Sequence, residues 1–414
     1  MKENIEYREV ENLDDIFNDA KDDYAFPGGV VAVGSSKENF TVKAYGHHTY
    51  SGARETSVDD IFDLASLTKV CSTTPAIMKL YDEKKINLND KIINYLPQLN
   101  GPNEYNTALK KEITIEHLLY HSSGFPPDND IYKMRDSSID ERWDSIFNTP
   151  LAYYPGVKCM YSDINMLILG KIVETVSGLT LDNYVEKNIC KPLGMNHSFY
   201  NPSDKYIDYI VPTEFSIYSD MPYKGVVDDE NARSLDGIAG HAGLFSTIND
   251  LIIYARMLLN KGMHNRIKIY SKETVNIFAQ RDKNIPGSCR ALGWLTAYDP
   301  KFVLPKQYRA EDSFILDKSE LYEDLNQPSA GMYIDSNAIG HTGFTGSSFW
   351  ISFKYDIFVL FLTNRVFPSR NYTPLEIFNY WRQRVNSAVW QNLGFREKNE
   401  LLELSKPSFY HKEN

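Results

Sequence analysis

Strand-like segments lie near both ends of this 414-residue chain and enclose a long helical middle. Near the start, residues 30–34 and 40–46 have the β-branched and aromatic composition of strands, and residues 347–353 and 357–363 repeat it near the end. Antiparallel strands from the two ends must pair with each other, so the helical part is an insertion. The sequence therefore predicts an α+β fold, an antiparallel sheet flanked by helices.

The predicted domain organisation follows from the same pattern. We expect a discontinuous sheet domain made of residues 1–85 and 270–414, with a mostly helical region, residues 86–269, between them. Apolar periodicity predicts helices at residues 12–22, 70–83, 113–121, 163–177, 182–190, 247–259 and 374–392, and a further helix beginning at 86–90. Pro75 predicts a bend or restart within 70–83. Residues 201–236 form a long loop, and such a loop in a compact domain is usually functional.

Composition excludes several classes of protein. The net charge of −11 disfavours nucleic acid as a partner, because the phosphates would be repelled. The four cysteines show neither metal nor disulfide spacing, and no run of eighteen apolar residues indicates a membrane span. We expect a soluble protein without a cofactor or metal, cytoplasmic as given and secreted if a leader has been removed, acting on a small molecule or peptide.

The most informative local motif is Ser-x-x-Lys, formed by Ser66 and Lys69. Residues three apart share one face of a helix, so the Ser66 hydroxyl and the Lys69 amine can lie side by side. A serine needs a neighbouring base to become a nucleophile, and a buried lysine can be that base. The alternative is a solvated helix end, because this short motif often arises by chance.

Two further segments have polar residues suited to catalysis. Tyr161 precedes Ser162 and Asp163 at the start of the helix predicted at residues 163–177, and His341-Thr342-Gly343 precedes the last pair of strands. For Tyr161, the alternative is a core tyrosine that opens an apolar helix. His117 and His121 have a zinc-compatible spacing but no third ligand, so we interpret them as capping or core histidines.

Together these segments resemble the serine β-lactamase and penicillin-binding-protein family, nearest to class C β-lactamases, D-alanyl-D-alanine carboxypeptidases and related esterases. Two more segments extend the resemblance over most of the chain: residues 118–124 look like the family's Leu-Leu-x-His-Thr-Ser-Gly, and residues 229–232 with 240–247 look like a subgroup of penicillin-binding proteins. The resemblance implies that Ser66 attacks a carbonyl carbon with help from Lys69.

The same resemblance assigns roles to residues near the predicted nucleophile. Tyr161 matches the family's Tyr-x-Asn tyrosine and would move protons as base and then acid. The backbone N–H groups of Ser66 and Phe344 would form the oxyanion hole. Gly343 would let a strand approach the substrate closely, and Thr342 would bind a substrate carboxylate or ester group.

The chain also departs from the family pattern at several positions. Asp163 stands where many members carry asparagine, so it would repel a substrate carboxylate or serve as a charge at a helix N-terminus. His341 replaces the lysine of Lys-Thr-Gly, and a mostly neutral histidine attracts a carboxylate more weakly. Asp228 occupies a place that the subgroup gives to histidine, with no role assigned. His241 fits equally a site wall or a loop hydrogen bond.

The predicted function is a serine hydrolase that forms an acyl-enzyme on Ser66. Candidate substrates are D-alanyl peptides, β-lactams and small esters or amides. The alternative is a non-catalytic module that acylates and stalls, or binds a ligand without turnover. A classical α/β-hydrolase is disfavoured, because the chain lacks Gly-x-Ser-x-Gly and its strands are not interleaved with helices.

Overall fold

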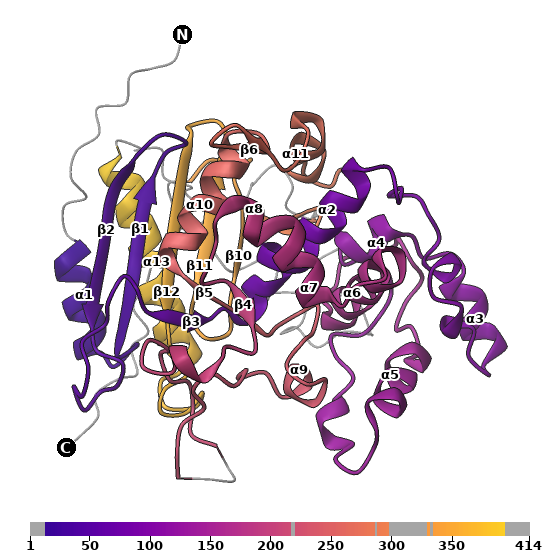
Figure 1. Cartoon of the computed structure of the whole chain (residues 1–414), viewed down its shortest axis with the longest axis horizontal. Coiled ribbons are helices and arrows are strands. Elements are labelled where there is room, and N and C mark those ends of the chain that lie inside the picture. Colours follow the sequence, from indigo (N-terminus) through magenta and orange to yellow (C-terminus); the bar gives the residue numbers. More distant parts are fainter. Residues whose placement is uncertain (1–12, 217–219, 286–287, 298–328, 332–333, 394–414) are drawn as a thin grey trace, which may run out of the picture.

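A seven-stranded antiparallel sheet forms the centre of the fold, with the helical region beside it (Figure 1). The computed structural model describes residues 13–216, 220–285, 288–297, 329–331 and 334–393. The strand order in the sheet is β2-β1-β12-β11-β10-β9-β8. These strands are β1 (Gly28–Gly34), β2 (Asn39–Gly46), β8 (Arg290–Ala291), β9 (Trp294–Thr296), β10 (Ile339–Thr342), β11 (Ser348–Ser352) and β12 (Ile357–Thr363).

The strands from the two ends of the chain are neighbours in this sheet, as predicted. β1 pairs antiparallel with β12, in a register that places Gly29 opposite Thr363 and Gly34 opposite Phe358. Every residue of β1 and β12 is buried. A central strand that is buried on both sides needs a layer of helices on each face of the sheet. The predicted α+β class is therefore confirmed.

Helices cover both faces of the sheet. On one face α1 (Leu13–Asp22) and α13 (Leu375–Asn392) pack against alternate residues of β1 and β12, and these side chains form one apolar cluster. On the other face α10 (Ile248–Leu259) contacts β1 and β12. This second face is continuous with the core of the helical region.

The helical region consists of short helices around α6 (Asp163–Ser177), whose C-terminus is the left-handed Gly178 that the sequence predicts. The other α-helices are α2 (Thr74–Asp82), α3 (Glu104–Lys110), α4 (Ile115–Leu119), α5 (Ile139–Asn148), α7 (Leu181–Val185), α8 (Lys191–Leu193), α9 (Glu230–Ser234) and α11 (Lys272–Phe278). A small sheet joins β3 (Ile61–Asp63), β5 (Leu244–Thr247) and β4 (Phe199–Tyr200), and a hairpin joins β6 (Met263–His264) to β7 (Ile267–Lys268). The predicted division into two regions stays a prediction.

Three predicted helices differ in the structure. The predicted 182–190 helix is α7 followed by a π-helical turn, Glu186–Cys190. Residues 86–90 form a turn rather than a helix, because the Asp90 carboxylate accepts a hydrogen bond from the backbone N–H of Asn87 (2.7 Å). The predicted 70–83 helix is interrupted: Lys69–Thr73 is a π-helical turn, and α2 begins at Thr74. Pro75 lies in the first turn of α2, directly after the π-helical turn, so α2 restarts near Pro75 as predicted.

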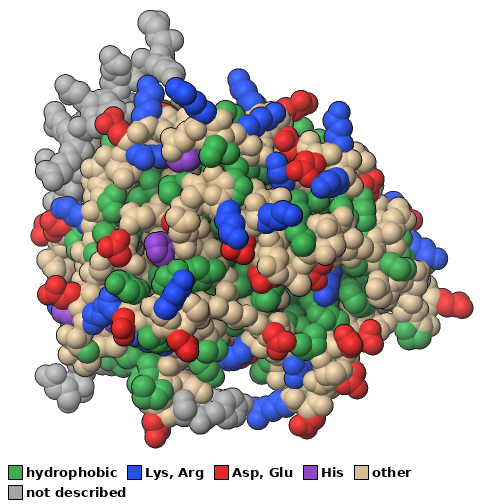
Figure 2. All heavy atoms as spheres, in the orientation of Figure 1, with side chains coloured by type: hydrophobic (Ala, Val, Ile, Leu, Met, Phe, Trp, Pro, Cys, Tyr) green, Lys and Arg blue, Asp and Glu red, His purple; other side chains and the backbone are tan. Residues whose placement is uncertain are grey.

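Charged side chains of both signs are interspersed over the face of the molecule shown in Figure 2, with apolar atoms between them. This face therefore presents no extended region with charge of a single sign.

Within the described ranges, no single helix has the length and apolar character needed to cross a membrane.

Candidate active site

Ser66 lies on a short 3-10 turn, Ala65–Leu67, that directly follows β3. Ala65 has a φ of 45°, which is in the left-handed region that non-glycine residues rarely adopt. The Asp63 carboxylate accepts a hydrogen bond from the Ala65 N–H (2.8 Å), and the Asp63 carbonyl accepts one from Thr345 Oγ1 (2.9 Å). Asp63 therefore holds this strained turn in place and fixes Ser66, the predicted nucleophile, against the loop after β10.

The amine of Lys69 lies directly beside Ser66. Its Nζ is 2.9 Å from Ser66 Oγ, 3.0 Å from the carbonyl oxygen of His241 and 2.7 Å from Asp163 Oδ1, with which it forms an ion pair. Three oxygens match the three donors of an ammonium group. Burial would lower the pKa of Lys69, but the charge of Asp163 and the neighbouring Tyr161 outweigh it, and the net shift is upward. Lys69 is therefore a charged group in this structure.

Tyr161 completes the arrangement, because its hydroxyl donates a hydrogen bond to Ser66 Oγ (2.9 Å). The Lys69 amine also lies 4.9 Å from the centre of the Tyr161 ring. Burial raises the pKa of Tyr161, while the Lys69 charge lowers it, and burial dominates. Three groups from two distant parts of the chain thus converge within hydrogen-bonding reach.

The segment His341–Phe344 forms the opposite wall of the site. Gly343 is required there by a close approach, since a Cβ at this position would lie 2.6 Å from the carbonyl oxygen of Leu64. Phe344 is 45% exposed at the rim of the pocket. No distance tests the predicted oxyanion N–H of Phe344, so this role stays a prediction.

Two buried histidines flank the Tyr161 ring. The ring centres of His121 and His341 lie 5.0 Å and 5.9 Å from that of Tyr161. His121 Nδ1 accepts a hydrogen bond from the Ser162 N–H (3.1 Å). Burial, together with the Lys69 and Arg290 charges, lowers the pKa of both histidines well below the usual value. His341 is therefore neutral at pH 7, in contrast to the lysine that the family pattern has at this position.

A pocket of about 250 Å³ opens beside Ser66 on the strand side. Its lining includes Ser66, Tyr161, His341, Thr342, Gly343 and Phe344, and also three arginines: Arg290, Arg365 and Arg382. Burial lowers the pKa of Arg365 to about 10 and that of Arg382 to about 9, so both stay charged at neutral pH. The pocket is therefore positively charged, although the chain as a whole is acidic.

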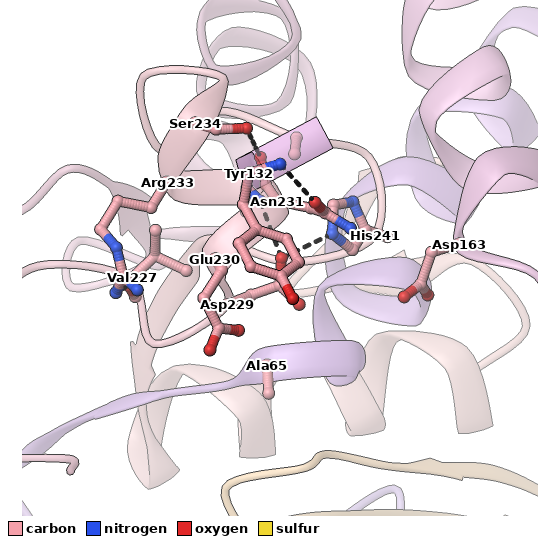
Figure 3. Close-up of polar contacts among 12 residues, drawn as sticks. Ala65, Tyr132, Asp163, Val227, Asp229, Glu230, Asn231, Arg233, Ser234 and His241 are labelled. Atoms are coloured by element: carbon pink, nitrogen blue, oxygen red, sulfur yellow. Dashed lines mark hydrogen bonds and ion pairs between the residues drawn. The ribbon is translucent and has the colours of Figure 1, made fainter. Parts of the chain in front are cut away.

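On the other side of Ser66, carboxylates gather near the start of α6. Asp163 and Asp229 flank the His241 ring in Figure 3, and one ligand atom from each of the three residues lies within 4.8 Å of the others. This geometry is compatible with a metal ion. However, the Lys69 ammonium already lies against Asp163, and its charge opposes a cation there.

The structure brings together most of the residues predicted from the sequence. Ser66, Lys69 and Tyr161 form one hydrogen-bonded cluster, which Asp163 joins through its ion pair with Lys69, and the wall formed by His341–Phe344 faces it. His241 is 1% exposed and contributes its backbone carbonyl to Lys69. His117 caps α4 with Thr114, in agreement with the predicted capping role.

Asp228 is buried against Asp63, behind Ser66, and does not line the pocket. Its backbone N–H donates to the Asp63 carboxylate (2.7 Å), and burial raises the pKa of its own carboxyl group to about 7.

Sequence reasoning missed Asp63, Asp229 and the three arginines as site residues. Asp229 stands within a motif named above, but no local pattern marks the arginines, because Arg290 comes from β8, Arg365 from the turn after β12 and Arg382 from α13.

Comparison with known proteins gives one family across the chain. The model of the Beta-lactamase family matches residues 13–379. The N-acetylmuramyl-L-alanine amidase of Bacillus subtilis (strain 168) is 30% identical over 370 residues, which are 82% of this chain and 77% of that protein. A putative D-alanyl-D-alanine carboxypeptidase of Salmonella typhimurium is 29% identical over 80% of this chain and 77% of its own length.

The fold comparison agrees with the sequence comparison. The structure of EstCE1, described as a hydrolase with promiscuous acyltransferase activity, matches with a TM-score of 0.68, 18% identity, and coverage of 92% of this chain and 98% of that one. The fold is thus that of the β-lactamases and penicillin-binding proteins. The chain belongs to the β-lactamase family. The family and the names of these relatives indicate hydrolase activity of the serine β-lactamase kind.

Proposed function

We propose that this protein is a serine amidase that forms an acyl-enzyme on Ser66 and cleaves an amide whose leaving group carries a carboxylate. The observation that carries the proposal is the contact of Ser66 Oγ with both Lys69 Nζ and Tyr161 Oη, each at 2.9 Å. A nucleophile within hydrogen-bonding distance of the group that would take its proton is the geometry that acyl transfer needs.

Tyr161, rather than Lys69, is the better candidate for the base in this arrangement. Lys69 faces three oxygens as an ammonium and has no lone pair with which to accept a proton. Its charge lowers the pKa of Tyr161, although burial raises this pKa and dominates, so the Lys69 charge would offset part of the cost of forming the phenolate. The phenolate would take the Ser66 proton as Oγ attacks the carbonyl carbon. Tyr161 would then give this proton to the leaving nitrogen when the C–N bond breaks, and water would hydrolyse the ester in a second step.

The arginines support a substrate with a negative charge. Among the described residues, Arg365 has no carboxylate partner: it donates to the Phe344 carbonyl (2.8 Å) and lies over the Phe344 and Phe378 rings. It is only 3% exposed and lines the pocket beside Ser66. The names of the two curated relatives contain N-acetylmuramyl-L-alanine and D-alanyl-D-alanine, in which the amide nitrogen belongs to an alanine, an amino acid that carries a carboxylate when it is C-terminal. Such a group would match this charge.

One panel of substrates tests the proposal with wild type and Ser66→Ala. It contains N-acetylmuramyl-L-alanine, a D-alanyl-D-alanine peptide, nitrocefin and p-nitrophenyl butyrate. We expect turnover of at least one carboxylate-bearing amide, and its loss in Ser66→Ala with an unchanged circular dichroism spectrum. Retained turnover in Ser66→Ala would refute the proposal. A penicillin label that stays on Ser66 for hours, without turnover of any substrate, would instead indicate the slowly deacylating binding module.

A further inference from the structure

A buried histidine–aspartate pair lies next to the proposed catalytic groups and has no role in the mechanism described so far. His241 Nε2 lies 2.8 Å from Asp229 Oδ1, and the side chain of His241 is 1% exposed. Asp229 also caps α9, because its Oδ1 accepts a hydrogen bond from the Ala232 N–H (2.7 Å). Figure 3 shows Asp229 between the start of α9 and the imidazole. The imidazole is therefore anchored to a fixed helix end.

The backbone of His241 contacts Lys69 directly. Its carbonyl oxygen accepts a hydrogen bond from Lys69 Nζ (3.0 Å). The preceding residue, Gly240, is wedged against α6, since a Cβ there would lie 1.9 Å from the Met166 carbonyl oxygen, and its own carbonyl accepts from Thr73 Oγ1 (2.6 Å). The peptide that supports Lys69 is thus held by Gly240 on one side and by the His241 side chain on the other.

The charges around Lys69 favour its ammonium form. Burial would lower the pKa of His241, but Asp229 and Asp163 raise it and the net shift is upward. The His241 and Lys69 charges hold the pKa of Asp229 well below its usual range, although burial opposes this. Two carboxylates therefore lie against two basic groups. The titratable groups that face Lys69 are Tyr161, Asp163, His121, His341, His241 and Asp229.

We propose that Asp229 and His241 form a positioning pair for Lys69: Asp229 fixes the imidazole, and this places the His241 carbonyl oxygen against the amine and keeps the amine charged beneath Ser66. The inference rests on the proposed acylation of Ser66 for its catalytic meaning. The pair touches neither the substrate nor the reacting atoms, and it acts through Lys69. Hydrogen bonds to an ammonium group stabilise its charged form.

The test compares Asp229→Asn with wild type in the full chain. Asparagine still caps a helix, so α9 keeps its first hydrogen bond while the negative charge is lost. A matched control is Asp60→Asn, which removes the charge from a second buried histidine–aspartate pair in the described part of the chain, His48 with Asp60 (2.7 Å), away from the pocket. A second variant, His241→Gln, keeps a side-chain amide that can donate to Asp229, whereas His241→Ala does not.

Two readouts separate positioning from damage to the fold. The first is a ¹³C NMR titration of the Lys69 Cε signal, assigned with Lys69→Arg; we expect its pKa to fall by about one unit in Asp229→Asn and to stay unchanged in Asp60→Asn. The second is the pH profile of kcat with p-nitrophenyl butyrate or any substrate that wild type turns over. Because activity needs charged Lys69, its alkaline limb should move to lower pH by a similar amount, with kcat reduced about tenfold and KM unchanged. His241→Gln should retain more activity than His241→Ala.

The outcomes distinguish this inference from the proposed function. If wild type acylates no substrate at Ser66, the proposed function fails, while the NMR titration still tests the positioning pair. A Lys69 titration that coincides in wild type and Asp229→Asn would overturn the inference even in an active enzyme. Activity that is lost on treatment with EDTA and restored by Zn²⁺ would also overturn it, because Asp163, Asp229 and His241 would then act as metal ligands.

Discussion

The two sides of the cleft are built differently. On the helical side, Ser66 Oγ lies 2.9 Å from both Lys69 Nζ and Tyr161 Oη, and Lys69 Nζ lies 2.7 Å from Asp163 Oδ1, so these polar groups have partners within the protein. On the strand side, the pocket wall carries buried arginines and an exposed Phe344. In the proposed mechanism the helical side would carry out proton transfer, and the strand side would leave charge available to an incoming molecule.

This difference separates two kinds of effect that a substitution can have. Changes on the helical side should alter the rate of the chemical step for every substrate, because they act on the nucleophile. Changes on the strand side should alter the affinity for charged substrates in particular, because they act on recognition.

Tyr161→Phe should show the effect of the helical side most strongly. We expect kcat to fall by roughly 10²–10⁴, the usual contribution of a general acid–base group, because phenylalanine keeps the ring but cannot move a proton. The measurement is steady-state kinetics with a charged amide and an uncharged ester. Tyr95→Phe, which removes a hydroxyl bonded to Asp90, is the matched control. A loss below threefold would remove Tyr161 from the mechanism.

Arg365→Gln should give the opposite signature on the strand side. We expect KM for a carboxylate-bearing amide to rise roughly 10–100-fold, since a hydrogen bond to a charged group contributes about 1.5–3 kcal/mol, while p-nitrophenyl butyrate is affected little. Arg256→Gln is the control, because Arg256 bonds Ser35 and Asn39 and does not line the pocket. Equal losses with both substrates would contradict a recognition role.

Asp228→Asn tests the buried acids behind the nucleophile through stability. Burial raises the pKa of Asp228 to about 7 and that of Asp63 to about 6. The folded protein therefore keeps protons that the unfolded chain has released, and the free energy of unfolding should fall as pH rises from about 4 to about 7. Asp228→Asn should reduce this fall by an amount on the order of 1 kcal/mol.

Urea denaturation at pH 5 and pH 8 measures this difference. Asp59→Asn, which changes an exposed acid in the same part of the chain, is the control. The interpretation of Asp228 is wrong if wild type and Asp228→Asn lose the same stability between the two pH values.

Phe344→Ala should have the mildest effect of these variants. The Arg365 and Arg370 guanidinium groups lie 4.5 Å and 5.3 Å from the centre of the Phe344 ring. Such contacts contribute about 0.5–1 kcal/mol at exposed sites, so we expect a two- to fivefold change in KM and no change in kcat. A larger fall in kcat would place Phe344 nearer to the reacting atoms than the rim of the pocket.

Much of the fold could be predicted because it depends on periodic apolar patterns. The pairing of β1 with β12, the helix α6 with its Gly178 end and the restart near Pro75 follow from local sequence. The prediction that residues 86–90 begin a helix is wrong. The Asp90 carboxylate accepts a hydrogen bond from the Asn87 N–H, and this bond competes with helix formation. The spacing of apolar residues contains no information about such a bond.

The sequence by itself determined the family and the identity of the central groups, because Ser66 and Lys69 are three residues apart and Tyr161 opens a helix with a recognisable pattern. Only the tertiary structure decided how these groups are charged and what surrounds them. The ion pair between Lys69 and Asp163, the support from His241 and the arginine-lined pocket depend on distances between segments more than ninety residues apart. Protonation follows from burial and neighbouring charge, which exist only once the chain is folded.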